Sequence, residues 1–264
     1  MSKQTIAALG DIPITIAALG DTPITQYFWG GGPKQPSTRQ TIIAVRWGTI
    51  PVVRAILGLT TVMRVAHVWD TFNRPNNPLD ADGRWVDYGT ATTYRACIEN
   101  TVARIGIPDG LTTTTQAVSY MRCATRKSTT DDGYIQCRVF SVGDTTGLKT
   151  YDTAVFAKVN DDFTDGVGIH LSGNTLGLVV RRNSIDTVVD TFGQFSTNDI
   201  IRITFSGDDY TLNCNAQTRG TWTDRLGQIA SDAGHRSLGI RVEGAASSDG
   251  VRAFSPALDH VELG

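Results

Sequence analysis

The segment Ile201-Arg202-Ile203-Thr204-Phe205 places an apolar residue at every second position. The turn-forming residues Ser206-Gly207-Asp208-Asp209 follow it, and a second short run, Tyr210–Cys214, comes next. Alternation with a period of two buries one face of a strand, and Gly and Asp favour a tight turn between two strands. This stretch therefore predicts an antiparallel β-hairpin.

The same sequence pattern extends from residue 67 to the C-terminus. Short apolar runs recur between clusters of Asp, Gly, Asn and Thr, and no segment has a convincing helical pattern over ten residues. We predict strands at His67–Phe72, Tyr94–Ile98, Val102–Ile105, Ala117–Cys123, Tyr134–Val142, Thr153–Val159, Val167–Leu171, Leu176–Val180, Thr187–Phe192, Ile200–Phe205, Tyr210–Cys214, Ser237–Val242 and Leu258–Leu263. This spacing is typical of an antiparallel two-sheet sandwich, so the predicted fold is an all-β jelly roll.

The composition favours strands and turns. The 264 residues include 35 Thr, 27 Gly and 23 Asp but only 3 Glu, and 40% are hydrophobic, which is enough for a sizeable core. A net charge of −2 argues against nucleic-acid binding through bulk charge. The chain has neither a signal-peptide pattern nor an apolar stretch of membrane-spanning length, so we expect synthesis in a cytosol and no membrane insertion.

The N-terminal region contains a ten-residue repeat. Thr5–Ile14 and Thr15–Ile24 share nine identities, and a degenerate pair, Trp47–Val52 and Leu57–Val62, keeps the same offset. Each unit predicts a short strand, a Gly-x turn and a short return strand.

A Gly- and Pro-rich stretch, Tyr27–Ser37, separates the two pairs and begins with the apolar cluster Tyr-Phe-Trp. Isolated two-stranded hairpins are marginal in water, and the repeats carry few charges. We therefore predict that residues 1–66 form a hairpin module for docking and oligomerisation, as a homotrimer or another symmetric set, and that residues 67–264 form the sandwich.

Several motifs in the second region resemble a known family. Asp70-Thr71-Phe72-Asn73-Arg74, followed by Pro78-Leu79 and Trp85, resembles the opening of concanavalin A/laminin-G-like domains in tail proteins of actinobacterial phages. Further segments that resemble this family are Gly168–His170, Leu178–Arg181, Ile200–Ile203, Tyr210–Leu212, Gly239–Val242 and Leu258–Glu262. The resemblance implies that the first and last strands pair. One departure is Asn213-Cys214-Asn215, which stands where an Asn-Gly turn is usual.

The N-terminal repeats are also similar to hairpin repeats that open minor tail proteins of mycobacteriophages. Together the two resemblances imply a non-enzymatic virion structural protein of a tailed phage, with other virion proteins as partners. The sandwich would be displayed for host-surface contact. Two alternatives stay open: a decoration protein on the capsid surface, and a carbohydrate-binding module that recognises a host glycan.

The four cysteines, Cys97, Cys123, Cys137 and Cys214, are scattered without a C-x-x-C pair, which disfavours a zinc site. We expect buried, reduced thiols. The histidines His67, His170, His235 and His260 are interpreted as ordinary strand residues.

No catalytic residue is predicted. A glycosidase needs two carboxylates at a set separation, but Glu99, Glu243 and Glu262 form no strand motif of alternating acids. No nucleophile elbow of the G-x-S-x-G type occurs. We therefore expect no enzymatic activity.

We expect no cofactor either. The loop Asp80-Ala81-Asp82-Gly83 begins like a calcium loop, but Arg84 occupies the fifth position. Asp161, Asp162 and Asp165 form a second acidic loop. The laminin-G resemblance leaves a calcium ion open at such loops, with solvated turn carboxylates as the simpler interpretation. Trp85 is expected in the core, and Trp85 and Tyr88 are the aromatic residues considered for stacking on a sugar.

Overall fold

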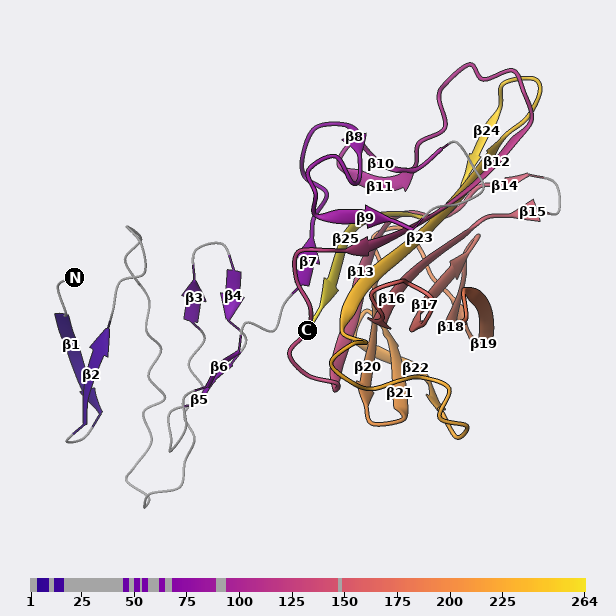
Figure 1. Cartoon of the computed structure of the whole chain (residues 1–264). Helices are drawn as coiled ribbons and strands as arrows, with labels where there is room; N and C mark the ends of the chain where they lie inside the picture. The colour runs from indigo at the N-terminus through magenta and orange to yellow at the C-terminus, as the bar shows by residue number, and fades with distance from the viewer. Residues whose placement is uncertain are drawn as a thin grey trace. The chain divides into compact units, whose positions relative to one another are not determined.

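The computed structural model describes residues 68–88, 94–146 and 149–264, together with six short strands in the N-terminal region. The chain divides into two compact units, Met1–His67 and Val68–Gly264. Figure 1 shows the strands of both units. Throughout the described residues the secondary structure consists of strands, turns and bends, without a helix.

The N-terminal unit contains three antiparallel hairpins. Leu9 is opposite Ile12 in the first, Trp47 is opposite Ile50 in the second, and Ile56 is opposite Val62 in the third. The strands are β1 (Gln4–Leu9), β2 (Ile12–Ile16), β3 (Val45–Trp47), β4 (Ile50–Val52), β5 (Arg54–Ile56) and β6 (Val62–Arg64). Most of the second repeat unit and all of Tyr27–Ser37 lie outside the described residues. The docking and oligomerisation role of this region stays a prediction.

The second unit is built from two antiparallel sheets, which confirms the all-β sandwich. The nine-stranded sheet has the order β22-β21-β20-β13-β25-β11-β10-β8, and β7 also pairs with β25. Its strands are β7 (Val68–Asp70), β8 (Asn77–Pro78), β10 (Ala96–Glu99), β11 (Val102–Ile105), β13 (Gly133–Ser141), β20 (Ile200–Ser206), β21 (Asp209–Cys214), β22 (Gln217–Thr223) and β25 (Ala257–Leu263).

The eight-stranded sheet has the order β19-β18-β17-β16-β23-β12-β9, and β24 also pairs with β23. Its strands are β9 (Trp85–Asp87), β12 (Thr115–Cys123), β16 (Asp152–Val159), β17 (Gly166–Ser172), β18 (Thr175–Arg182), β19 (Ile185–Gln194), β23 (Ser237–Ala246) and β24 (Arg252–Phe254). A separate two-stranded ribbon is formed by β14 (Thr145–Thr146) and β15 (Lys149–Thr150).

The first and last strands of the sandwich pair, as the resemblance implies. Val68, Trp69 and Asp70 of β7 are opposite Leu263, Glu262 and Val261 of β25. The ends of this unit are therefore joined within one sheet.

The family-like motif at Asp70 forms a buried corner. The Asp70 carboxylate accepts hydrogen bonds from the Phe72 backbone N–H (2.8 Å), from Arg74 Nη1 (2.6 Å) and from Trp85 Nε1 (2.7 Å). Phe72 and Trp85 are 0% and 2% exposed, and their ring centroids lie 6.3 Å apart. Phe72 adopts φ +52°, a left-handed conformation that the surrounding contacts must hold. The motif therefore has a structural role, and Trp85 is a core residue as predicted.

The core fills the space between the sheets. Alternate residues of each central strand face it, for example Val155, Ile169 and Ile240 of the eight-stranded sheet and Ile203 and Val261 of the other. All four cysteines are free thiols. Cys123, Cys137 and Cys214 are buried, but Cys97 is only half-buried, because it lies on β10 near the edge of its sheet.

The structure also contains strands that the sequence did not indicate. These are β8, β9, β14, β15, β22 and β24. Five are only two or three residues long, whereas β22 is a polar edge strand, so none shows a clear apolar alternation. The departure at Asn213–Asn215 still makes a tight turn, since Asn215 and Ala216 both have positive φ.

Candidate functional site

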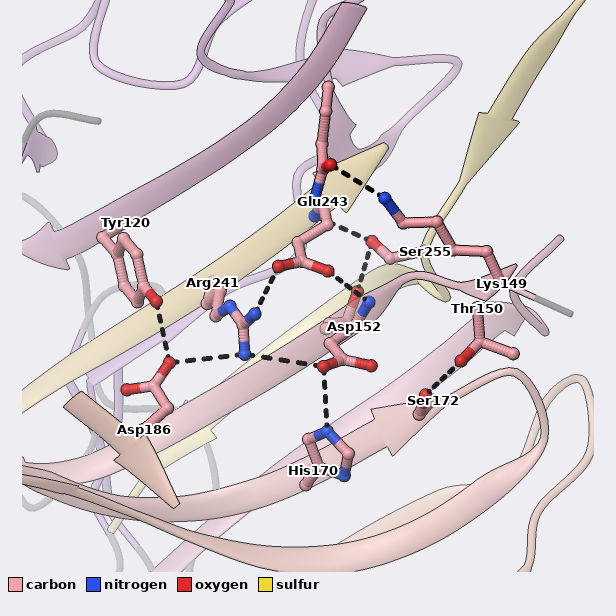
Figure 2. Close-up of polar contacts among 12 residues, drawn as sticks. Tyr120, Lys149, Thr150, Asp152, His170, Ser172, Asp186, Arg241, Glu243 and Ser255 are labelled. Atoms are coloured by element: carbon pink, nitrogen blue, oxygen red, sulfur yellow. Dashed lines mark hydrogen bonds and ion pairs between the residues drawn. The ribbon is translucent and has the colours of Figure 1, made fainter. Parts of the chain in front are cut away.

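The candidate site lies on the outer face of the eight-stranded sheet, the face turned away from the core. Residues that alternate with the core positions point to this side, among them Tyr120 on β12, Asp152 on β16, His170 on β17 and Arg241 on β23. Figure 2 shows these side chains converging, although they come from segments far apart in the sequence.

The sheet is strongly curled around this face. Tyr120 and Asp186 lie on β12 and β19, which are five strand steps apart. In a flat sheet that separation is about 24 Å. Here Tyr120 donates a hydrogen bond of 2.8 Å to Asp186, so the β19 end of the sheet bends over toward β12. Gly177 permits one of the close approaches, because a Cβ there would lie 2.7 Å from the Asp190 carbonyl oxygen.

Asp186 is held by three donors. Besides the bond from Tyr120, its carboxylate accepts a hydrogen bond of 2.6 Å from Arg181 Nη1 and lies 3.3 Å from Arg241 Nη1. The Arg181 guanidinium lies 4.0 Å from the centre of the Tyr120 ring. Burial raises the pKa of Tyr120 to about 12, so its hydroxyl stays protonated and donates. We name Tyr120, Arg181, Asp186 and Arg241 the clasp, since they join the two ends of the curled sheet.

A loop fills the space next to the clasp. Residues 160–165 fold over the face and insert Phe163, which is 1% exposed. Its ring packs edge-on against Tyr88, Tyr120 and Phe156 at 5.5–6.1 Å. Gly239 makes room for it, because a Cβ at that position would lie 2.5 Å from the ring. We name this loop the plug.

The other end of the face remains polar and more accessible. Lys149, Thr150, Asp152, His170 and Ser172 gather there, and we name these five residues the open end. The side chain of Asp152 is 28% exposed, compared with 10% for Asp186 in the clasp. Thr150 and Ser172 share a hydrogen bond of 3.0 Å.

Arg241 connects the clasp to the open end. Its guanidinium pairs with Glu243 and lies 3.7 Å from Asp152 Oδ2. Glu243 also accepts a hydrogen bond of 2.9 Å from the Asp152 backbone N–H. Burial alone would lower the pKa of Arg241, but the neighbouring carboxylates outweigh this and raise it, so the residue is a permanent cation.

The ionisation of Asp152 is fixed by its neighbours. Burial alone would raise the pKa of Asp152. Hydrogen bonds from His170 and Ser172 and the charges of His170 and Arg241 outweigh this effect and lower it. Asp152 is therefore an anion at neutral pH and a hydrogen-bond acceptor. His170 is 7% exposed, with Nε2 at 3.4 Å from Asp152 Oδ2 and with Nδ1 lacking a hydrogen-bond partner among the described residues.

The carboxylates on this face can be compared with the acid–base pair of a glycosidase. Such a pair needs one carboxyl group that remains protonated near neutral pH. On this face Asp152, Asp186 and Glu243 each have an arginine nearby, and the pKa of Asp152 is lowered. The other two glutamates lie elsewhere: Glu99 pairs with Arg104 at 3.2 Å, and Glu262 bonds to Tyr134 on the nine-stranded sheet.

The acidic loops considered for calcium are engaged by basic or polar side chains. Asp80 pairs with Arg95 at 3.0 Å, and Asp82 pairs with Arg74 and Arg84 at 3.2 Å each. Asp161 pairs with Lys127 at 2.6 Å, and Asp165 accepts hydrogen bonds from Asn160 and Thr164. Within the described ranges, three or more His, Cys, Asp or Glu side chains nowhere gather as a metal site would require.

One further expectation, that His235 lies in a strand, needs correction. His235 lies in a loop before β23 rather than in a strand, where it contacts Asp232. Tyr88 and Trp85 do not form an exposed aromatic platform, because Trp85 is buried and Tyr88 packs between Phe163 and Arg122. His170 and His260 do lie in strands, whereas His67 is outside the described residues.

A cavity of about 600 Å³ lies at the β8 edge of the nine-stranded sheet, and we name it the edge cavity. It is lined by residues of β8 and β10 and by the segment after β11, including Tyr94, Cys97 and Pro108. Its two arginines are paired, Arg95 with Asp80 and Arg252 with Asp109. No helix in the described part of the chain is long and apolar enough to cross a membrane.

Comparisons with known proteins return similar structures and no sequence relatives. No protein-family model matches the chain, and no curated protein matches it. The carbohydrate-binding module CBM66 from Bacillus subtilis is 10% identical, with a TM-score of 0.44, over 69% of this chain and 96% of that one.

Two further structures are similar at the same level. The Emp47p carbohydrate recognition domain is 12% identical, with a TM-score of 0.48, over 75% of this chain and 94% of that one. The Bacillus licheniformis β-glucanase is 13% identical, with a TM-score of 0.47, over 75% of this chain and 97% of that one. The function proposed below therefore rests on the residues of the outer face.

Proposed function

We propose that this protein is a non-enzymatic virion structural protein of a tailed phage, a minor tail protein whose sandwich binds a host-surface glycan at the open end. The observation that supports glycan binding is the mixture of fixed acceptors and donors there. Asp152 is an ionised acceptor, while Lys149, Thr150 and Ser172 supply donors. Sugar hydroxyl groups both donate and accept, so they match such a surface.

The absence of catalysis is part of the proposal. The lowered pKa of Asp152 supports it, since a carboxylate that is ionised at neutral pH does not act as a general acid, and Asp186 and Glu243 are both paired with Arg241. The phage assignment is supported by the sequence resemblances at Asp70–Trp85 and in the N-terminal repeats. A capsid decoration protein remains the alternative within the same class.

The binding test uses the full-length chain on an array of immobilised oligosaccharides, with reducing ends measured in parallel. We expect retention of one sugar class, loss of that retention in Asp152→Asn, and no released reducing ends. Asp109→Asn is the matched control, because Asp109 lies at the edge cavity and its side chain is 88% exposed. Retention unchanged in Asp152→Asn, or sugar release that depends on one acidic residue, would contradict the proposal.

The virion assignment needs its own test. Gold-labelled antibodies against the sandwich are applied to purified particles and viewed by electron microscopy. Label on the tail is the expected result. Label on the capsid supports the decoration protein instead, and no label on any particle rules out both.

A further inference from the structure

The clasp and the plug divide the outer face into two unequal parts. On the clasp side, Asp186, Arg181 and Arg241 have side chains that are only 7–14% exposed, and Phe163 is almost completely buried. On the other side, Thr150 and Lys149 are exposed and Asp152 is partly so. Access to the face therefore comes from the open end.

The closed part is held firmly at several points. Arg181 donates to the Phe163 carbonyl oxygen at 2.7 Å and to Asp186 at 2.6 Å, so one side chain fastens the plug to the clasp. Within the plug, Asn160 accepts the backbone N–H groups of Thr164 and Asp165. A ligand cannot pass beneath the clasp without breaking these buried, charge-assisted contacts.

The open end includes a buried polar group with spare bonding capacity. His170 is more than nine-tenths buried and its Nδ1 lacks a partner among the described residues. Nε2 faces Asp152 at 3.4 Å, so Nδ1 points away from that carboxylate and lies beside the backbone of Gly177. The accessible acceptor at the open end is Asp152, whose side chain is 28% exposed, so a sugar hydroxyl that approaches from this side can donate to its carboxylate.

We infer that the outer face binds the terminal sugar of a glycan and excludes the interior of a chain, an inference that rests on the glycan-binding function proposed above. A polysaccharide lying across the sheet would need space on both sides of the bound sugar. The clasp occupies the space on one side, so the chain cannot continue in that direction. The terminal residue enters from the open end, bonds to Asp152, and leaves the rest of the chain in solvent.

The test compares affinities of the full-length chain for soluble probes by isothermal titration calorimetry. The probes are methyl glycosides of the common hexoses and pentoses, the matching linear di-, tetra- and hexasaccharides, and cyclic glucans, which have no chain end. We expect the Kd of the responding sugar to change by less than about threefold from the monosaccharide glycoside to the hexasaccharide. Cyclic glucans give no signal, and Asp152→Asn weakens binding of every responding probe by at least tenfold.

Three outcomes separate this inference from the function on which it rests. Affinity that rises tenfold or more with chain length, or binding of a cyclic glucan, overturns terminal recognition while leaving glycan binding intact. Binding that Asp152→Asn leaves unchanged places the glycan elsewhere on the protein. No heat with any probe, together with no retention on the array, overturns both proposals.

Discussion

Two of the clusters in which arginine meets carboxylate in the sandwich, those at Asp70 and at Arg241, differ in how they are assembled. The corner at Asp70 draws its side chains from residues 70–85, within one stretch of sequence. The cluster at Arg241 joins Tyr120, Asp152, Asp186 and Glu243 from strands throughout the eight-stranded sheet. The first is buried in the core, whereas the second reaches a partly exposed surface.

The contrast shows how structural and functional polar groups differ in accessibility. Both Asp70 oxygens accept hydrogen bonds and the residue is 3% exposed, so nothing is left to meet a ligand. At the Arg241 cluster, Asp152 remains partly exposed and His170 keeps an unpartnered nitrogen. We therefore expect mutations at Asp70 to affect folding and mutations at the open end to affect binding.

The largest effect is expected at the Asp70 corner. Asp70→Ala leaves Arg74 and Trp85 Nε1 without their buried acceptor, and breaking a buried ion pair in this way costs about 3–5 kcal/mol. Urea unfolding of the full-length chain, followed by tryptophan fluorescence, measures the loss. A destabilisation below 1 kcal/mol would mean that the corner is not a structural centre.

An intermediate effect is expected at the clasp. Asp186→Asn removes the anion that Tyr120, Arg181 and Arg241 share, and hydrogen bonds to charged groups contribute about 1.5–3 kcal/mol. Tyr120→Phe removes only one neutral donor and should cost about 1 kcal/mol. The same urea titrations measure the loss of unfolding free energy, which should decrease in the order Asp70→Ala, Asp186→Asn, Tyr120→Phe. A reversed order would show that the curl of the sheet does not depend on the clasp.

The smallest effect on stability is expected at Asp152 and depends on pH. Its pKa in the folded protein lies below the unfolded value of about 3.9. The resulting stabilisation is thus fully present above pH 4 and is lost as the pH falls through the folded pKa. Because the group is partly exposed, we expect a contribution below about 1 kcal/mol.

Asp152→Asn tests this directly. The difference in unfolding free energy between the wild type and the variant should be largest at pH 6–7 and should shrink toward pH 3. A difference that grows on acidification would mean that the folded-state pKa of Asp152 is raised rather than lowered.

Local pattern was sufficient to predict most of the sandwich. Alternation located the central strands, for example Val102–Ile105 with its exact bounds and Ile200–Phe205 to within one residue. The pairing of the first and last strands was implied by the family resemblance of the Asp70 motif, and not by alternation. The strand β22 has the sequence QTRGTWT, and its exposed edge position removes the hydrophobic alternation that would have revealed it.

The outer-face site could not be predicted in the same way. Tyr120 and Asp186 are 66 residues apart, and Arg241 lies a further 55 residues along the chain from Asp186. Their contact depends on how far the sheet curls, which is set by packing around residues such as Gly177 and Phe163. Asp152 and Arg241 looked like ordinary polar positions on strands, because the curl that brings them together has no local sequence signal.

The most direct test of the account is a crystal structure of the full-length chain with the responding sugar bound. We predict density for one sugar residue at the open end, within hydrogen-bond distance of Asp152, with its remaining chain directed away from the clasp. Density in the edge cavity beside Cys97 and Arg252, or a sugar chain lying across Tyr120 and Arg181, would contradict the account.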